Sequence, residues 1–293
     1  MKKLLFTVFG LIIALSASAQ KSTDAAPQKL DKGLLWKITG KGISKPSYLL
    51  GTLHATCNLV LDDNILTALE NTQQLYLELD MDDPNLQTQL MASMKMKNDV
   101  KMSTLAKPEE YAKVDAFLKA ILGYPVQAVD SFMPLLVTSM LIPKMVDCEI
   151  QSVEGDLIKH TQNQEEQIYG LETVEDQLAV FDAVPYTEQM AELVKTASDN
   201  MAASKAELQR IMTLYKEKDL NAIYNFTLQE GSPMFAKHIE TFLNNRNKNW
   251  VPKIEAVAKA KPTLFAVGAA HLPGENGVIM LLRKKGYKVE AVK

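Results

Sequence analysis

The sequence predicts an α/β protein with a mixed, mainly parallel sheet, a helical cover and an inserted helical cap. Short apolar runs alternate with helical segments near both ends of the chain, and this order is typical of a sheet covered by helices. The middle of the chain is mostly helical in character, which indicates the cap. Neither a linker nor a low-complexity tract divides the 293 residues, so one domain is expected over residues 33–293.

The expected strands are short apolar runs bounded by turn residues. In chain order they are Leu34–Ile38, Ser47–Gly51, Gln74–Asp80, Gln167–Leu171, Leu264–Gly268 and Lys288–Val292. A turn at Gly40–Pro46 joins the first two. In the third, QLYLELD, leucines alternate with other residues, so Glu78 and Asp80 share one face of the strand.

The expected helices fall between these strands. They are Asn64–Asn71, Glu154–Thr161, Val174–Phe181, Trp250–Ala260 and Gly277–Lys285. Asp62 or Asp63 is a suitable cap for the first, and Gly286 ends the last. Residues 84–146 and 187–245 form two further helical insertions. The first insertion is rich in Met, which fills irregular gaps in protein cores; an adaptable face for an apolar peptide is the alternative.

The first twenty residues have the layout of a secretory signal peptide. Lys2 and Lys3 precede the apolar stretch Leu4–Leu15, and the small residues at 17–19 favour cleavage after Ala19. No later segment reaches the roughly 20 apolar residues of a membrane-spanning helix. We therefore predict a periplasmic or secreted protein with no stable membrane span after signal removal. An uncleaved anchor is the alternative, and residues 20–32 are expected to be flexible.

Composition narrows the function further. The chain has 32 Lys and Arg against 35 Asp and Glu, a formal net charge of −3, which argues against nucleic acid as the main partner. Hydrophobic residues make up 47% of the chain, enough for a substantial core. Cys57 and Cys148 could pair in an oxidising compartment, but the sequence leaves open whether they form a disulfide or remain free thiols.

Two phrases near opposite ends of the chain have the same pattern, SYLLGTLHA and LFAVGAAHL. Each is an apolar strand followed by Gly-x-x-His, at Gly51–His54 and Gly268–His271. Glycine permits a sharp turn, and the histidine then lies beyond the carboxyl end of its strand, where open α/β sheets bind ligands. Neutral imidazole is a strong ligand for Zn, Mn, Fe and Co. Two unrelated structural histidines are the alternative.

Three carboxylates could complete such a site. Glu78 lies in an apolar strand, where a carboxylate needs a partner unless that face meets water. Glu172 ends the phrase IYGLET at the same expected edge; the alternative is a helix cap in which Thr173 caps and Glu175 or Asp176 supports the first turn. Glu154 precedes a helix, where a negative charge is favourable in any case.

One arginine is a candidate to bind an anion. Arg246 lies in the phrase NNRNKNW, and its guanidinium could hold a carboxylate or an oxyanion through two hydrogen bonds. The alternative is a cation that stabilises a helix end.

At these residues the sequence resembles the TraB/GumN family, relatives of the Tiki metalloproteases. The matching phrases are YLLGTLH, LYLELD, GLETVEDQ, RNKNW and VGAAHLPGENGVIMLLRKKGYKV. The resemblance implies a fold shared with the erythromycin esterase and ChaN-like groups, and a metal-dependent hydrolase site. The residues that match the family pattern are His54, His271, Glu78, Glu172, Arg246 and, at roughly the right place, Glu154.

We therefore predict an exported metal-dependent hydrolase that acts as a peptidase on a peptide or protein. His54, His271 and Glu78 would hold a divalent Mn, Co or Zn ion, while Glu172 and Arg246 would serve as general base and oxyanion donor, with Glu154 beside them. A non-enzymatic protein that binds a peptide or haem, and a metal-independent esterase with histidine as base, are the alternatives. The substrate, the metal and the oligomeric state stay open.

Overall fold

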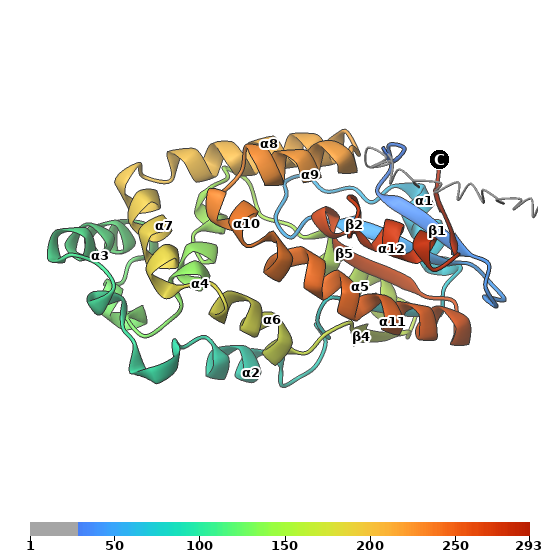
Figure 1. Ribbon diagram of the computed structural model, residues 1–293, viewed down its shortest axis with the longest axis horizontal. Helices are drawn as coiled ribbons and strands as arrows, with labels where there is room; N and C mark the ends of the chain where they lie inside the picture. Colours follow the sequence, from blue (N-terminus) through green and yellow to red (C-terminus); the bar gives the residue numbers. More distant parts are fainter. Residues whose placement is uncertain (1–28) are drawn as a thin grey trace, which may run out of the picture.

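The computed structural model describes residues 29–293, so the predicted signal peptide lies outside the described residues. Six strands form one mixed sheet in the order β4-β3-β5-β2-β1-β6 (Figure 1). They are β1 (Leu35–Thr39), β2 (Ser47–Thr52), β3 (Gln74–Leu77), β4 (Gln167–Gly170), β5 (Leu264–Gly268) and β6 (Lys288–Ala291). The ladders between β2, β5, β3 and β4 are parallel, whereas β1 is antiparallel to both of its neighbours. The predicted mixed α/β class is confirmed.

The register of the central strands brings the two Gly-x-x-His phrases together. Thr52 at the end of β2 pairs with Gly268 at the end of β5. A Cβ at Gly51 would lie only 3.2 Å from the Cα of Ala269 in the second phrase. A larger residue here would push the two turns apart by a few tenths of an ångström, because they pack directly against each other.

Strand β3 ends earlier than its sequence pattern predicts, at Leu77 rather than Asp80. The backbone still pairs for one more step, because Glu172 N–H donates to the Glu78 carbonyl at 3.0 Å. Beyond the ladder, the Glu78 side chain is free to turn toward β5, which the alternation rule for a continuing strand does not anticipate.

Helices around the sheet supply the main hydrophobic core (Figure 1). They are α1 (Asp63–Glu70), α5 (Val153–Asn163), α8 (Ala202–Lys216), α9 (Leu220–Gln229), α11 (Asn245–Ala260) and α12 (Val278–Lys284). Helix α11 packs through Trp250, Val251 and Ile254, which are at most 2% exposed. This packing fixes one face of α11 against the carboxyl ends of the strands.

Helices from both predicted insertions pack together at one end of the molecule (Figure 1). They are α2 (Leu86–Ser93), α3 (Pro108–Leu122), α4 (Pro134–Ser139) and α7 (Tyr186–Ser198), with α6 (Val174–Asp182) alongside. The second insertion is divided, because its helices α8 and α9 cover the sheet and its helix α10 (Pro233–Lys237) packs against α9. Met102, Met133 and Met190 are at most 1% exposed in this second core, so these methionines are core residues. Met91 is 53% exposed and does not share that role.

The loop after β2 is covalently fastened. Cys57 and Cys148 form a disulfide with a Cα–Cα distance of 6.0 Å, which answers the question left open by the sequence. Beside it, Thr56 pairs with Gln151 in an isolated β-bridge, and the Gln151 side chain accepts a hydrogen bond from Leu59 N–H. The loop that carries His54 is thereby joined to the residues that lead into α5.

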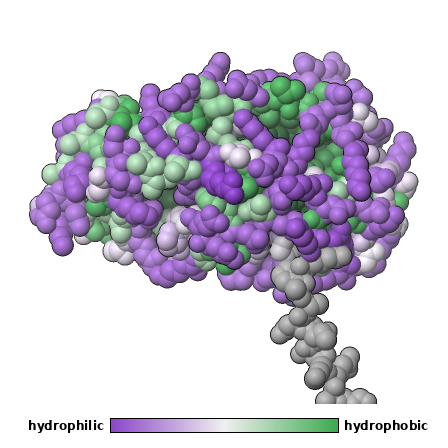
Figure 2. Space-filling view, turned by 90° about the horizontal axis from the view of Figure 1, so that it is seen from above, coloured by the Kyte–Doolittle hydropathy of each residue, from purple (hydrophilic) through white to green (hydrophobic). Residues whose placement is uncertain are grey.

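The segment 20–32, predicted to be flexible, lies mostly outside the described residues, but its end is anchored. Leu30 is 3% exposed, and its backbone exchanges two hydrogen bonds with the Asn221 side chain. Across the described residues, the helices are too short or too polar to span a membrane. The face seen in Figure 2 is largely hydrophilic, with smaller apolar areas between the polar side chains.

Candidate functional site

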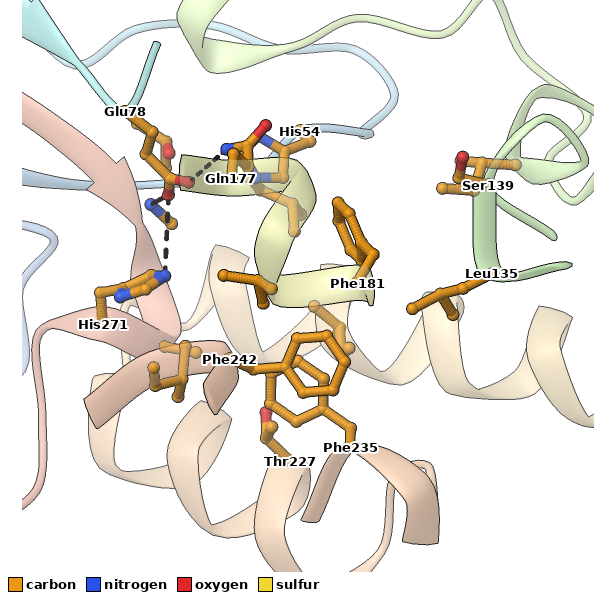
Figure 3. A pocket seen from close by; sticks show the side chains of 18 of the residues that line it. His54, Glu78, Leu135, Ser139, Gln177, Phe181, Thr227, Phe235, Phe242 and His271 are labelled. Atoms are coloured by element: carbon orange, nitrogen blue, oxygen red, sulfur yellow. Dashed lines mark hydrogen bonds and ion pairs between the residues drawn. The ribbon is translucent and has the colours of Figure 1, made fainter. Parts of the chain in front are cut away.

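A cavity of about 750 Å³ lies between the carboxyl ends of the central strands and the helical cap. Polar side chains gather at its sheet end, among them His54, Glu78 and His271 (Figure 3). Apolar and aromatic side chains line the rest. The structure thus brings both predicted histidines into one cavity, although they are 217 positions apart in the sequence.

His54 faces a carboxylate from α5. Its Nδ1 lies 2.8 Å from Oε1 of Glu154, which stands in the first helical turn behind the N-cap Ser152. Burial of the ring opposes its charged form, but Glu154 and then Glu78 outweigh this and raise the pKa of His54 to about 9. The side chain is nevertheless 67% exposed, so water in the cavity screens these interactions. Glu154 itself is 6% exposed, and contact with His54 lowers its pKa against the effect of burial.

Glu78 lies at the centre of the site. Its Oε1 accepts a hydrogen bond from Gly268 N–H at 2.8 Å, and its Oε2 accepts one from Arg246 Nη2 at 2.6 Å. Burial alone would raise the pKa of Glu78, but His271, Arg246, His54 and this amide together lower it to about 2. We attribute most of that fall to Arg246 and the amide, because His271 is itself neutral. Glu78 is therefore ionised at neutral pH.

His271 is buried and uncharged. Burial lowers its pKa to about 3, and Glu78 opposes this only in part. Its ring lies against the indole of Trp250, with centroids 4.5 Å apart, and its Nε2 is 3.8 Å from Glu78 Oε1. The two histidines of the repeated pattern therefore differ in charge.

Arg246 connects the two buried glutamates. Its Nε donates to both oxygens of Glu172 at 3.1 and 3.2 Å, while Nη2 donates to Glu78. Trp250 Nε1 adds a hydrogen bond to Glu172 at 3.0 Å. Burial, together with the charge of Glu78, raises the pKa of Glu172 despite Arg246. Since its oxygens are engaged by Arg246 and Trp250, Glu172 is less free to take up a proton than the predicted role of general base requires.

The sequence signals for helix starts near the site are confirmed. Thr173 caps α6 in a capping box with Asp176, as the alternative interpretation of this segment proposed. That cap leaves the preceding Glu172 side chain free to point toward Arg246. The capping interpretation is therefore confirmed for Thr173, while a functional role of Glu172 stays a prediction.

The side chains of His54, Glu78 and His271 surround one small space. A Cβ at Gly268 would lie 3.3 Å from Glu78 Oε1, 3.6 Å from a ring carbon of His271 and 3.8 Å from His54 Nε2. Two imidazoles and a carboxylate form a donor set that suits Zn, Mn or Co. Within residues 29–293, however, no group of three or more His, Cys, Asp or Glu side chains is arranged to hold a metal ion. In this structure Arg246 supplies the positive charge beside Glu78.

Three residues of the site were not identified from the sequence as individual contributors. Asn247 Oδ1 accepts a hydrogen bond from Nδ1 of His271 at 2.6 Å, Trp250 donates to Glu172, and Gln177 donates to both Glu78 and Glu172. A signal existed for two of them, because Asn247 and Trp250 belong to the phrase RNKNW. Their positions relative to Arg246, one and four residues later on α11, place all three near one face of the helix.

The turn that precedes Arg246 is also unusual. Residues Glu240–Asn244 form a π-helical turn that runs directly into α11. Such turns insert an extra residue into a helix and often occur at functional sites. Here the turn sets the rotation at which Arg246 and Asn247 meet the strands.

Fold and site together define an α/β protein in which histidine, glutamate and arginine side chains meet at the carboxyl edge of the sheet. The sequence model of the TraB/PrgY/gumN family matches residues 34–291, so the chain belongs to this family. The predicted resemblance is confirmed.

Several relatives of the chain are named metalloproteases. It is 22% identical to metalloprotease TIKI1 of Danio rerio over 318 residues, which cover 90% of the chain and 64% of that protein. It is 21% identical to TIKI2 of Danio rerio, over 93% of the chain and 63% of that protein. It is 23% identical to TIKI1 of Homo sapiens, over 94% of the chain and 65% of that protein. The chain thus spans less than two thirds of the length of these relatives.

No solved structure matches the chain. The similarity to the erythromycin esterase and ChaN-like folds therefore stays a prediction.

Proposed function

We propose that this protein is an exported metal-dependent hydrolase that cleaves peptides. One observation carries the proposal: His54, Glu78 and His271 converge around Gly268 at the polar end of a large apolar cavity. The names of the related metalloproteases support the same class of reaction.

In this proposal His54, Glu78 and His271 hold a divalent ion, with Mn, Co and Zn as candidates. When bound, the ion would polarise the scissile carbonyl and make a nucleophile of water. Arg246 Nη1 donates to His271 Nε2 in this structure, so ion binding would compete with that hydrogen bond. The residue types suit such an ion, but the described side chains are not arranged to hold one in this structure. Binding would require them to move and Arg246 to release His271.

The chain's own residues would carry the remaining steps. Arg246 lines the cavity, and its donors are engaged by Glu78, Glu172, His271 and the Phe242 carbonyl. It would bind the developing oxyanion or a substrate carboxylate by giving up one of these contacts. Glu154 lines the cavity but is 6% exposed and paired with His54, whereas Arg246 and Trp250 occupy Glu172. Either glutamate would therefore have to give up a present contact to take a proton from water as general base.

The cavity beyond the polar end supports a substrate with apolar side chains. Phe181, Phe235 and Phe242 stand next to the site, with Leu135 across the cavity from it (Figure 3). The rings of Phe235 and Phe242 stack with centroids 4.6 Å apart. A large apolar side chain entering here would leave water and gain about 1.5–3 kcal/mol of transfer free energy.

The test combines metal content with activity. We expect the purified protein to bind Zn, Co or Mn in stoichiometric amount and to cleave members of a peptide library, and the His54→Ala and His271→Ala variants to lose both properties. His160→Ala is the matched control, since His160 is exposed on α5 away from the cavity. Absence of metal binding, or full activity in both site variants, would overturn the proposal.

A metal-independent hydrolase is the second candidate. It is favoured by the contact between His54 and Glu154, which resembles the pairing of a catalytic base with an orienting carboxylate. Because the pKa of His54 is raised to about 9, this turnover would increase as the pH rises toward that value. In that case chelators leave turnover intact, while His54→Ala still abolishes it. For the haem-binding alternative the described residues offer no specific support.

A further inference from the structure

Asn247 is a buried amide placed directly behind one of the proposed metal ligands. Its side chain is 1% exposed, and its Oδ1 lies 2.6 Å from Nδ1 of His271. Its Nδ2 donates to the backbone carbonyls of His271 at 3.2 Å and Asn276 at 2.9 Å. One side chain of α11 thus holds both the ring of His271 and the turn that carries it.

These contacts determine which way the amide faces. The two carbonyl oxygens can only accept hydrogen bonds, so the NH₂ group of Asn247 must point toward them. Its oxygen is then left facing the ring. Because an amide oxygen can only accept, Nδ1 of His271 must carry the proton.

The opposite side of the ring gives the same assignment independently. Nη1 of Arg246 lies 3.1 Å from Nε2 of His271, and a guanidinium can only donate. Nε2 must therefore be unprotonated. The lone pair of Nε2 lies on the side of the ring that faces Arg246 and Glu78.

We propose that Asn247 is a positioning residue that holds His271 as its Nδ1–H tautomer and presents Nε2 to a divalent cation. The cation part of this inference rests on the proposed function, whereas the tautomer part does not. Hydrogen-bond partners behind a metal-binding histidine fix the ring and its tautomer, and their loss typically weakens metal affinity about 10- to 100-fold.

The first measurement is ¹⁵N and ¹H NMR of the metal-free protein, with His271→Gln used to assign the His271 signals. We expect a protonated Nδ1 whose proton exchanges slowly with water, and an unprotonated Nε2. Asn247→Asp can still accept from Nδ1 and should keep this proton signal, shifted further downfield by the charge. Asn247→Leu should lose it or greatly speed its exchange. Asn249→Leu is the control, because Asn249 is exposed on the same helix.

The second measurement is titration with Co or Zn. We expect Asn247→Leu to bind about 10- to 100-fold more weakly than Asn249→Leu, and Asn247→Asp to recover most of the loss. A proton on Nε2 in the wild-type protein overturns the inference, as does an Asn247→Leu variant that matches the control in both measurements. If the wild-type protein binds neither ion, the proposed function and the cation part fail, and the NMR result still decides the tautomer. If Asn247→Leu does not fold, the spectra of the wild-type protein and of Asn247→Asp decide which tautomer His271 adopts.

Discussion

His54 and His271 follow paired strands in the same Gly-x-x-His pattern, yet their surroundings are opposite. The His54 side chain is 67% exposed and lies beside Glu154, and its pKa is raised to about 9. The His271 side chain is 5% exposed beneath α11, and its pKa is lowered to about 3. A repeated motif therefore fixes where a side chain stands, while the elements packed around it decide its charge.

We call the loop that carries His54 the His54 side of the site, and the turn that carries His271, with the first turns of α11, the His271 side. The two sides also differ in the contacts that hold them. The His54 loop is irregular and is fastened by the Cys57–Cys148 disulfide and the neighbouring β-bridge. His271 lies on a short helical turn, Ala269–His271, fixed by hydrogen bonds and ring packing from α11. The first side depends on a covalent link and the second on a buried polar network.

The largest effect is expected on the His271 side from Arg246→Met. This change leaves the buried carboxylates of Glu78 and Glu172 without their charged partner, which should cost about 3–5 kcal/mol of unfolding free energy. Urea unfolding measures the loss. Arg210→Met is the control, since Arg210 is exposed on α8. Equal stability of the two variants would contradict the buried network.

A smaller loss is expected on the His54 side from the double variant Cys57→Ser/Cys148→Ser. The disulfide links residues 91 apart in sequence, and loss of such a link typically costs about 2–4 kcal/mol. The pKa of His54 should also fall toward its ordinary value as the loop leaves Glu154, while His271 stays uncharged. Urea unfolding and histidine NMR titration of the metal-free protein test both points. Equal changes at the two histidines would mean that the sides are not held separately.

Trp250→Phe should have a more modest effect, confined to the His271 side. The variant keeps an aromatic ring against His271 but removes the hydrogen bond to Glu172, at a cost of about 1–3 kcal/mol. Thermal unfolding measures it, and the His54 NMR signals should not move. A shift of those signals would show that the two sides are coupled.

The smallest effect is the pH dependence that the His54–Glu154 contact gives to stability, because water screens this exposed pair. The folded pKa of His54 lies above its unfolded value of about 6.5. The contact therefore stabilises fully below that pH, and its contribution is lost as pH rises through about 9. Urea unfolding of the wild-type protein should show this loss between about pH 6.5 and 9, and Glu154→Gln should reduce it. A steeper loss in the variant would contradict the assignment.

Much of the fold was predictable because its signals are local. Apolar runs bounded by turn residues, and the alternation in QLYLELD, located all six strands. The Thr173 cap follows from backbone donors that need partners within a few residues. The end of β3 was placed three residues too late, because alternation continues past Leu77 although the ladder does not. Asn247 was overlooked as an individual residue because nothing within its own helix reveals its hydrogen bond to His271, 24 positions later.

The sequence by itself determined the strands, the two Gly-x-x-His turns and the candidate residues of the site, since periodicity and glycine act over a few residues. Only the tertiary structure decided that Cys57 meets Cys148, that Arg246 joins Glu78 to Glu172, and that one histidine is charged while the other is neutral. Those outcomes depend on side chains that folding brings together from distant segments. In a poorly solvated space, burial and neighbouring charges shift the pKa of a group away from its value in water.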